Sequence, residues 1–116
     1  METTKVNIKD LDGIALYYAI GVGSGCCEYS QDELYTIHYY NKHYDDFDSV
    51  ESLLKEYVRC VEYDSLFQEY IATARIDDGI YATSALLPEA IAMCAAKVIY
   101  KGRDCIDIPV CLMDNW

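Results

Sequence analysis

The strongest structural signal in the chain is a helix-forming segment bounded at both ends, residues 88–101. Pro88 fits the first turn of a helix, where its missing N–H removes no hydrogen bond, and Gly102 is the residue type expected just after a helix ends. Apolar residues recur between them at the spacing of one helical face: Ile91, Cys94, Ala95, Val98 and Ile99. The sequence therefore predicts an amphipathic helix that must pack its apolar face against another element.

The N-terminal region predicts a short strand and then another helix. Val6 and Ile8 alternate with polar neighbours, which is typical of a strand over residues 5–8. Asp10 or Asp12 can cap the following helix, because a carboxylate accepts hydrogen bonds from the free N–H groups of the first turn. The apolar stripe of this helix comprises Leu11, Ile14, Ala15, Tyr18 and Ala19.

Three glycines, Gly21, Gly23 and Gly25, then predict the end of this helix and a turn. The string does not match a phosphate-binding loop, because it follows a helix instead of a strand and lacks the Gly-Lys-Ser/Thr ending. We therefore expect a helix stop here.

The middle of the chain mixes strand and helix signals. Leu34–Tyr40 is rich in aromatic and β-branched residues, which predicts a strand. A helix that Asp48 or Ser49 can cap is then predicted from its amphipathic spacing. The apolar residues of that helix are Val50, Leu53, Leu54, Tyr57, Val58 and Val61. Glu51 and Lys55 add a favourable pair four residues apart.

Residues 65–85 leave two structures open. The first is a helix with the apolar stripe Leu66, Phe67, Tyr70 and Ile71, which is favoured up to about Tyr70, with a hairpin or loop after it. The other is a hairpin with the loop Asp77-Asp78-Gly79, in which Gly79 supplies a positive φ. Cys105–Ile108 then alternates as a short strand that Pro109 ends.

The order of these elements predicts a small α+β fold, in which two to three helices pack on a short antiparallel sheet. The length of 116 residues suits a single domain over residues 1–116. The 27 Ile, Leu and Val residues are enough for one modest core.

Two segments of the chain have a recognisable pattern. The C-terminal one is Pro88-Glu89-Ala90-Ile91-Ala92-Met93-Cys94, then Gly102, then Ile106-Asp107-Ile108-Pro109. It resembles the end of the NinX-like phage proteins, in which a Pro-led helix with Ala-Met-Arg runs to a Gly and a Val-x-Val-Pro strand. Leu11–Ile20 is similar to the first helix of that family, Leu-x-Gly-x-Ala-Leu-x-Trp-Ala-Val, with Tyr18 at the Trp position.

This resemblance implies a gene of phage or prophage origin with an accessory role. The family has no agreed activity, so the resemblance implies no catalytic residues. Residues 26–85 lie outside it.

The charge of the chain excludes several classes of partner. Twenty acidic and nine basic side chains give a formal net charge of −11. Nucleic acid and anionic membranes are bound through Lys and Arg, so we expect no direct contact with either. The charge is concentrated in residues 28–69, which hold eleven acidic and three basic side chains.

No segment has the pattern of a secretion signal or a membrane span. The longest weakly polar run, Ile14–Cys27, is too short to cross a bilayer. We therefore expect a cytoplasmic protein, in the bacterial host cell, whose six cysteines are reduced and mostly buried. No two cysteines have the spacing of a zinc or redox motif, and no cofactor is expected.

The histidines offer weak support for a metal site. His38 and His43 lie near three aspartates, but five residues along a strand separate them by about 17 Å and place them on opposite faces. We expect solvent-facing polar residues and no metal. A cysteine–histidine nucleophile pair has no local support either, so we expect no enzyme.

Tyrosines gather in the same acidic stretch. Eight of the twelve fall between residues 29 and 70, where they offer rigid contact area beside charges that would steer a basic partner. The predicted partner-binding face comprises Tyr39, Tyr40, Tyr44, Asp45, Asp46, Asp48 and Glu51. The alternative is a solvated acidic surface, with Tyr57 and Tyr70 in the core.

The sequence supports three hypotheses about function. The first is a phage- or prophage-encoded accessory binding protein that docks on a basic groove of a host protein. It would act as a nucleic-acid mimic, in the manner of an anti-CRISPR or other anti-defence inhibitor. The second is a self-assembling structural domain, for example a dimer, with tyrosines between subunits. The third is a small enzyme with a cysteine nucleophile.

Overall fold

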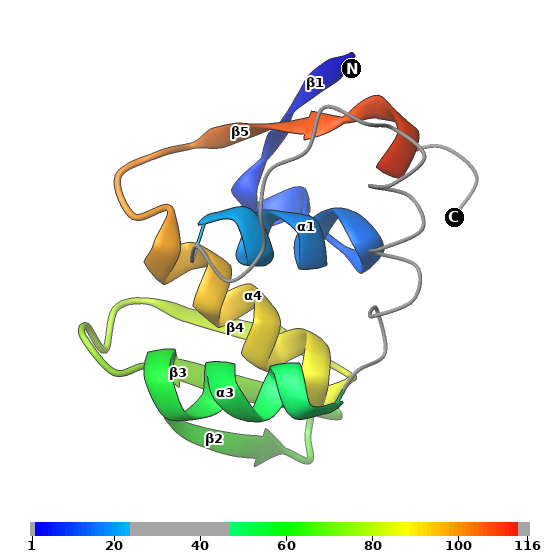
Figure 1. Ribbon diagram of the computed structural model, residues 1–116. Coiled ribbons are helices and arrows are strands. Elements are labelled where there is room, and N and C mark those ends of the chain that lie inside the picture. The colour runs from blue at the N-terminus through cyan, green and yellow to red at the C-terminus, as the bar shows by residue number, and fades with distance from the viewer. Residues whose placement is uncertain (1, 24–46, 114–116) are drawn as a thin grey trace.

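A computed structural model describes residues 2–23 and 47–113, with residues 47–50 described by their backbone only. These residues form a small α+β fold, as the sequence predicts (Figure 1). The elements are β1 (Thr3–Asn7), the 3-10 turn η1 (Ile8–Asp10), α1 (Gly13–Gly23), α3 (Phe47–Tyr57), β2 (Val58–Asp64), β3 (Glu69–Ala74), β4 (Tyr81–Ser84), α4 (Leu87–Ile99), β5 (Cys105–Pro109) and the 3-10 turn η2 (Val110–Leu112).

The first and last strands pair with each other in an antiparallel ribbon, separate from the other strands. Lys5 of β1 lies opposite Asp107 of β5, and their side chains form an exposed ion pair of 3.4 Å. Ile106 and Ile108 of β5 alternate with Asp107 and are buried against α1. The ribbon therefore covers one side of α1.

The other three strands form the antiparallel meander β2-β3-β4. Ala72 of β3 lies opposite Val61 of β2 and Ala82 of β4. Small side chains on this face allow α4 to approach the sheet closely. The resulting core cluster comprises Val58, Ala72, Ala74, Ala82, Ala90, Ile91 and Cys94.

The helix α4 lies at the centre of the fold, between the meander and α1 (Figure 1). Its Ala96 belongs to a second core cluster with α1 and β5. Since α4 and the ribbon lie on different sides of α1, Leu16 and Ile20 are buried in addition to the predicted stripe.

The terminal elements confirm the sequence predictions. α4 begins at Leu87 with Pro88 in its first turn, and it ends at Ile99. Gly102 has a φ of +87°, a conformation that favours glycine. The predicted N-terminal and C-terminal strands are present as β1 and β5, although Ile8 lies in η1 and not in the strand. Gly23 is the last residue described before the gap, so the predicted helix stop stays a prediction.

The predicted capping of the middle helix is wrong. α3 begins at Phe47, so Asp48 and Ser49 lie inside the helix and not at its cap. The error arises because Asp and Ser also fit the first helical turn, near the positive end of the helix dipole. The predicted pair is confirmed, since Lys55 Nζ lies 3.3 Å from Glu51 Oε1.

The predicted continuation of this helix to Val61 is also wrong. α3 ends at Tyr57, and Val58 is the first residue of β2. Val58 lies opposite Ala74, and Val61 lies opposite Ala72. Pairing with a strand further along the chain overrides the helical spacing of these valines.

The helix favoured up to Tyr70 is wrong as well, because Tyr70 lies in β3, opposite Tyr63. The β2–β3 turn contains Gln68, with a φ of +54°. The alternative hairpin is present as β3 and β4, but Gly79 does not take the predicted positive φ. Its N–H instead donates to Asp77 Oδ1 over 2.8 Å, which closes the loop.

Two remaining predictions concern other parts of the chain. The strand predicted at Leu34–Tyr40 lies outside the described residues. Among the described cysteines, all of them free thiols, Cys94 is buried, whereas Cys60, Cys105 and Cys111 are only half-buried. The prediction of mostly buried cysteines is therefore wrong for these three.

Candidate functional site

The predicted partner-binding face lies mostly outside the described residues. This applies to Tyr39, Tyr40, Tyr44, Asp45 and Asp46. Asp48 lies in the first turn of α3. Glu51, one turn later, is exposed and paired with Lys55. The described part of this face is therefore the N-terminal half of α3.

The turn between β2 and β3 holds the most exposed large apolar side chains of the described residues. Leu66 is 81% exposed and Phe67 is 68% exposed. Beside them, Tyr63 stacks on Tyr70 with ring centroids 4.9 Å apart. Neighbouring exposed apolar side chains of this kind mark sites of protein contact. We define the hairpin-tip surface as Tyr63, Asp64, Leu66, Phe67 and Glu69.

Carboxylates flank this apolar turn in both strands. Asp64 Oδ1 accepts hydrogen bonds from the backbone N–H groups of Leu66 and Phe67, over 2.9 and 3.4 Å. Glu69 lies directly opposite Asp64 in the ladder, and Glu62 is exposed two residues before Asp64. Asp64 thus closes the turn, whereas placing Glu69 opposite it disfavours the hairpin, because like charges face each other.

The hairpin-tip surface and the start of α3 lie at the same end of the molecule. In a meander, consecutive turns lie at opposite ends of the sheet, so the β2–β3 turn and the β4–α4 junction share one end. Leu86, in that junction, is 62% exposed. Figure 1 shows the N-terminal end of α3 at this end too. The start of α3, which is the described part of the predicted face, and the hairpin-tip surface therefore lie at one end of the sheet.

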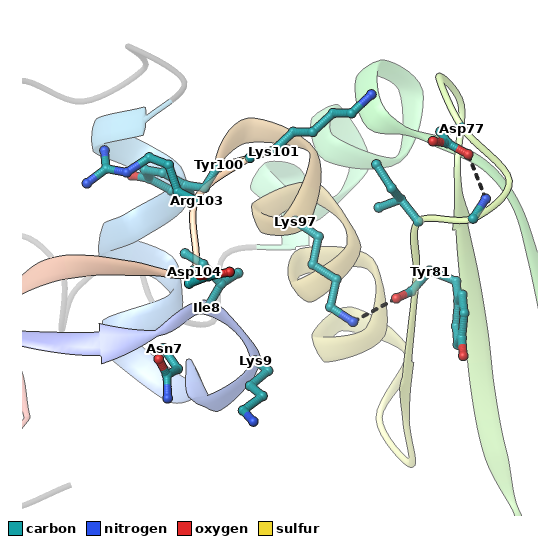
Figure 2. Close-up of a pocket in the computed structure, with 13 residues that line it drawn as sticks. Asn7, Ile8, Lys9, Asp77, Tyr81, Lys97, Tyr100, Lys101, Arg103 and Asp104 are labelled. Carbon is teal, nitrogen blue, oxygen red and sulfur yellow. Dashed lines mark hydrogen bonds between the residues drawn. The ribbon is translucent and has the colours of Figure 1, made fainter.

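An open cleft of about 780 Å³ lies at the other end, among η1, the C-terminal end of α4 and the β3–β4 turn (Figure 2). Four of the nine basic residues of the chain line it: Lys9, Lys97, Lys101 and Arg103. Its acidic residues are Asp77 and Asp104. The cleft is thus locally positive in a chain of net charge −11.

The cations of the cleft differ in their pairing from most of the others. Outside the cleft, Lys5, Lys55 and Arg59 each form an ion pair, with Asp107, Glu51 and Asp78 respectively. Arg75, the remaining described cation outside the cleft, donates instead to the backbone carbonyl of Val58. None of the four cleft cations has a carboxylate within ion-pair distance among residues 2–23 and 47–113. Acidic side chains outnumber basic ones twofold in this chain, so unpaired cations gathered in one cleft are unexpected.

Two of these cations are held in place by the walls of the cleft. Lys97 Nζ donates to the backbone carbonyl of Tyr81 over 2.8 Å and lies 5.8 Å from the centroid of the Tyr81 ring. The guanidinium of Arg103 lies 5.9 Å from the ring centroid of Tyr100. Tyr100 in turn donates a hydrogen bond of 2.6 Å from its hydroxyl to the carbonyl of Ala19.

Sequence reasoning missed the cleft because its cations come from segments far apart in the chain. Lys9 follows β1, whereas Lys97 lies in the last turn of α4 and Lys101 lies two residues after that helix. The four-residue spacing of these two lysines was the one local sign of a basic site. The same spacing is equally typical of cations that stabilise the negative end of a helix.

The described residues offer little reactive chemistry. Burial raises the pKa of the Cys94 thiol, with Cys60 adding to the shift and Lys97 opposing it. That thiol is protonated at neutral pH and is therefore a poor nucleophile. Within the described ranges, no three His, Cys, Asp or Glu residues are grouped so that they could hold a metal. No helix there combines the length and apolar character needed to cross a bilayer.

No family model, curated protein or solved structure matches this chain. The function is therefore inferred from the residues of the chain itself.

Proposed function

We propose that the protein is a non-catalytic binding protein whose hairpin-tip surface docks on a basic surface of a partner protein. The observation that supports this most is the exposure of Leu66 and Phe67 beside the carboxylates of Asp64 and Glu69. An apolar centre with a polar rim is the usual composition of a protein interface. Carboxylates in the rim steer a basic partner towards that centre.

Because the chain resembles phage proteins, we propose more specifically that the protein binds its partner by mimicking nucleic acid. Basic grooves in host proteins commonly hold nucleic acid through Lys and Arg. A phage- or prophage-encoded protein that occupies such a groove inhibits its owner, as an anti-CRISPR or other anti-defence inhibitor does. The net charge of −11 supports mimicry of nucleic acid.

A pull-down from a bacterial host lysate tests the proposal. The baits are the wild type, Leu66→Ser/Phe67→Ser and the control Ile76→Ser, which changes an exposed apolar residue in the β3–β4 turn. We expect the wild type and the control to retain one nucleic-acid-binding protein in about 50 mM salt and to release it in about 200 mM salt. The double variant should not retain it.

A second pair of variants separates local charge from net charge. Glu62→Gln/Glu69→Gln removes two carboxylates at the hairpin tip, and Asp10→Asn/Asp107→Asn removes two elsewhere. Only the first pair should weaken capture. Equal weakening by both pairs, or capture that survives Leu66→Ser/Phe67→Ser, would contradict the proposal. A stable oligomer in light scattering that dissociates in the double variant would instead identify self-assembly.

A further inference from the structure

We propose that the cleft at the C-terminal end of α4 binds a multiply charged phosphate compound of low molecular weight, with one phosphate group between Lys9 and Lys97. This site is separate from the hairpin-tip surface, which lies at the opposite end of the meander. The two sites can therefore be tested independently.

The pairing of the basic residues is the first argument. Of the four described cations outside the cleft, Lys5, Lys55 and Arg59 have a carboxylate partner within 3.4 Å, and Arg75 donates to a backbone carbonyl. The cleft cations have none among the described residues, although the chain has 20 acidic side chains. An external anion would provide the negatively charged partner that these cations lack among the described residues.

The arrangement of the side chains is the second argument. Figure 2 shows Lys9 extending from η1 and Lys97 from α4 on the side of the helix that faces Tyr81, whereas Lys101 and Arg103 extend in other directions from the segment that follows α4. Lys97 is already fixed by the carbonyl of Tyr81, so a ligand does not have to order it. Lys9 and Lys97 are therefore the direct contacts, and the other two cations contribute through their field.

The acidic groups of the cleft do not cancel this charge. The Asp77 carboxylate accepts the N–H of Gly79 and belongs to the β3–β4 turn. Four cations and two carboxylates line the cleft, so the cations are in excess by two charges. The negative end of α4 offsets only about half a charge of this excess. The net potential in the cleft is therefore positive even beside the last turn of α4.

The acidic end of the molecule is too distant to repel such a ligand at moderate salt. The six residues of β3 that separate the two ends span roughly 20 Å, and the Debye length in 0.1 M salt is about 10 Å. A volume of about 780 Å³ is of the size that small-molecule sites have. A ligand with several charges can engage more than one of the cations.

Titration of the full chain with sodium tripolyphosphate, followed by calorimetry, tests this site. We expect binding with one-to-one stoichiometry that weakens about tenfold in Lys9→Gln and in Lys97→Gln, and less in Lys101→Gln. Lys5→Gln/Lys55→Gln, which removes two paired cations, should bind within about twofold of the wild type. Lys97→Arg keeps the charge and should retain binding.

Amide NMR shifts provide a second readout that does not depend on any variant. Tripolyphosphate should shift the amides of Gly79 and Gly102, which line the cleft, and leave Leu66 and Phe67 unmoved. The proposal is overturned if the wild type does not bind about 1 mM tripolyphosphate in low salt, if the control pair loses as much affinity as the cleft variants, or if the shifts map elsewhere. A parallel titration with an acidic peptide that binds more tightly than tripolyphosphate would assign the cleft to a protein partner and also overturn it.

Discussion

The hydroxyl of Tyr100 donates a hydrogen bond of 2.6 Å to the backbone carbonyl of Ala19, across 81 residues of sequence. This bond joins the end of α4 to α1, and the same tyrosine ring supports Arg103 in the cleft. One side chain thus connects the second core cluster with the proposed ligand site.

Replacing Tyr100 with Phe should lower the free energy of unfolding by about 1 kcal/mol, because the ring stays and the hydrogen bond is lost. Urea denaturation measures this. Tyr81→Phe is the matched control, since the Tyr81 ring is exposed and its hydroxyl has no hydrogen bond to the described residues. An unchanged midpoint for Tyr100→Phe would show that the bond contributes nothing.

Gly23 allows α1 to end against this tyrosine. A Cβ atom at Gly23 would lie 2.5 Å from Tyr100 Oη and 2.6 Å from Ile99 Cγ2. Gly23→Ala should therefore cost about 1–3 kcal/mol of stability, as overpacking does. At Gly79 a Cβ would lie 3.2 Å from the flexible carboxylate of Asp77, so Gly79→Ala should change the melting temperature much less. Equal losses at the two glycines would contradict this account.

Stability should fall in alkaline solution. Burial raises the pKa of Tyr100 above 10.0, with Arg103 opposing, and it raises the pKa of Cys94 above 9.0. The folded state therefore holds these protons where the unfolded chain releases them, and the free energy of unfolding decreases as pH rises from about 9 upward. Tyr100→Phe should show a shallower decrease. A free energy that stays constant between pH 8 and 11, values that bracket both groups, would refute the assignment.

The leucine at the hairpin tip should contribute little to the fold. Leu66→Ala should change the free energy of unfolding by no more than about 0.5 kcal/mol, because the side chain is almost fully solvated. Leu112→Ala, the same change at a site that is 1% exposed, should cost about 2–5 kcal/mol. Thermal denaturation of the two variants makes the comparison. A large loss for Leu66→Ala would mean that this leucine belongs to the core.

The elements that the sequence predicts well are those with local end signals. Pro88 and Gly102 bound α4 because proline and glycine restrict the backbone wherever they occur. Val58 and Val61 were misassigned because their partners, Ala74 and Ala72, lie in another strand. A helical period and a strand with buried small partners cannot be told apart from the valines alone.

The two candidate surfaces escaped sequence reasoning for a related reason. Leu66 and Phe67 were counted in a helical stripe, so their exposure at a turn could not be foreseen. Lys9 meets Lys97 only after β1 has paired with β5 and placed η1 beside α4. By contrast, the local acidity of the middle segment was visible in the sequence, and Glu62 and Glu69 belong to it.

The most direct test of the proposed function is amide hydrogen exchange of the full chain, alone and bound to the partner that the wild type captures. The account predicts slower exchange at Tyr63–Glu69 and in the first turns of α3 on binding, with no change in the β3–β4 turn. Protection confined to the β3–β4 turn and the end of α4, with the hairpin tip exchanging as in the free protein, would contradict it.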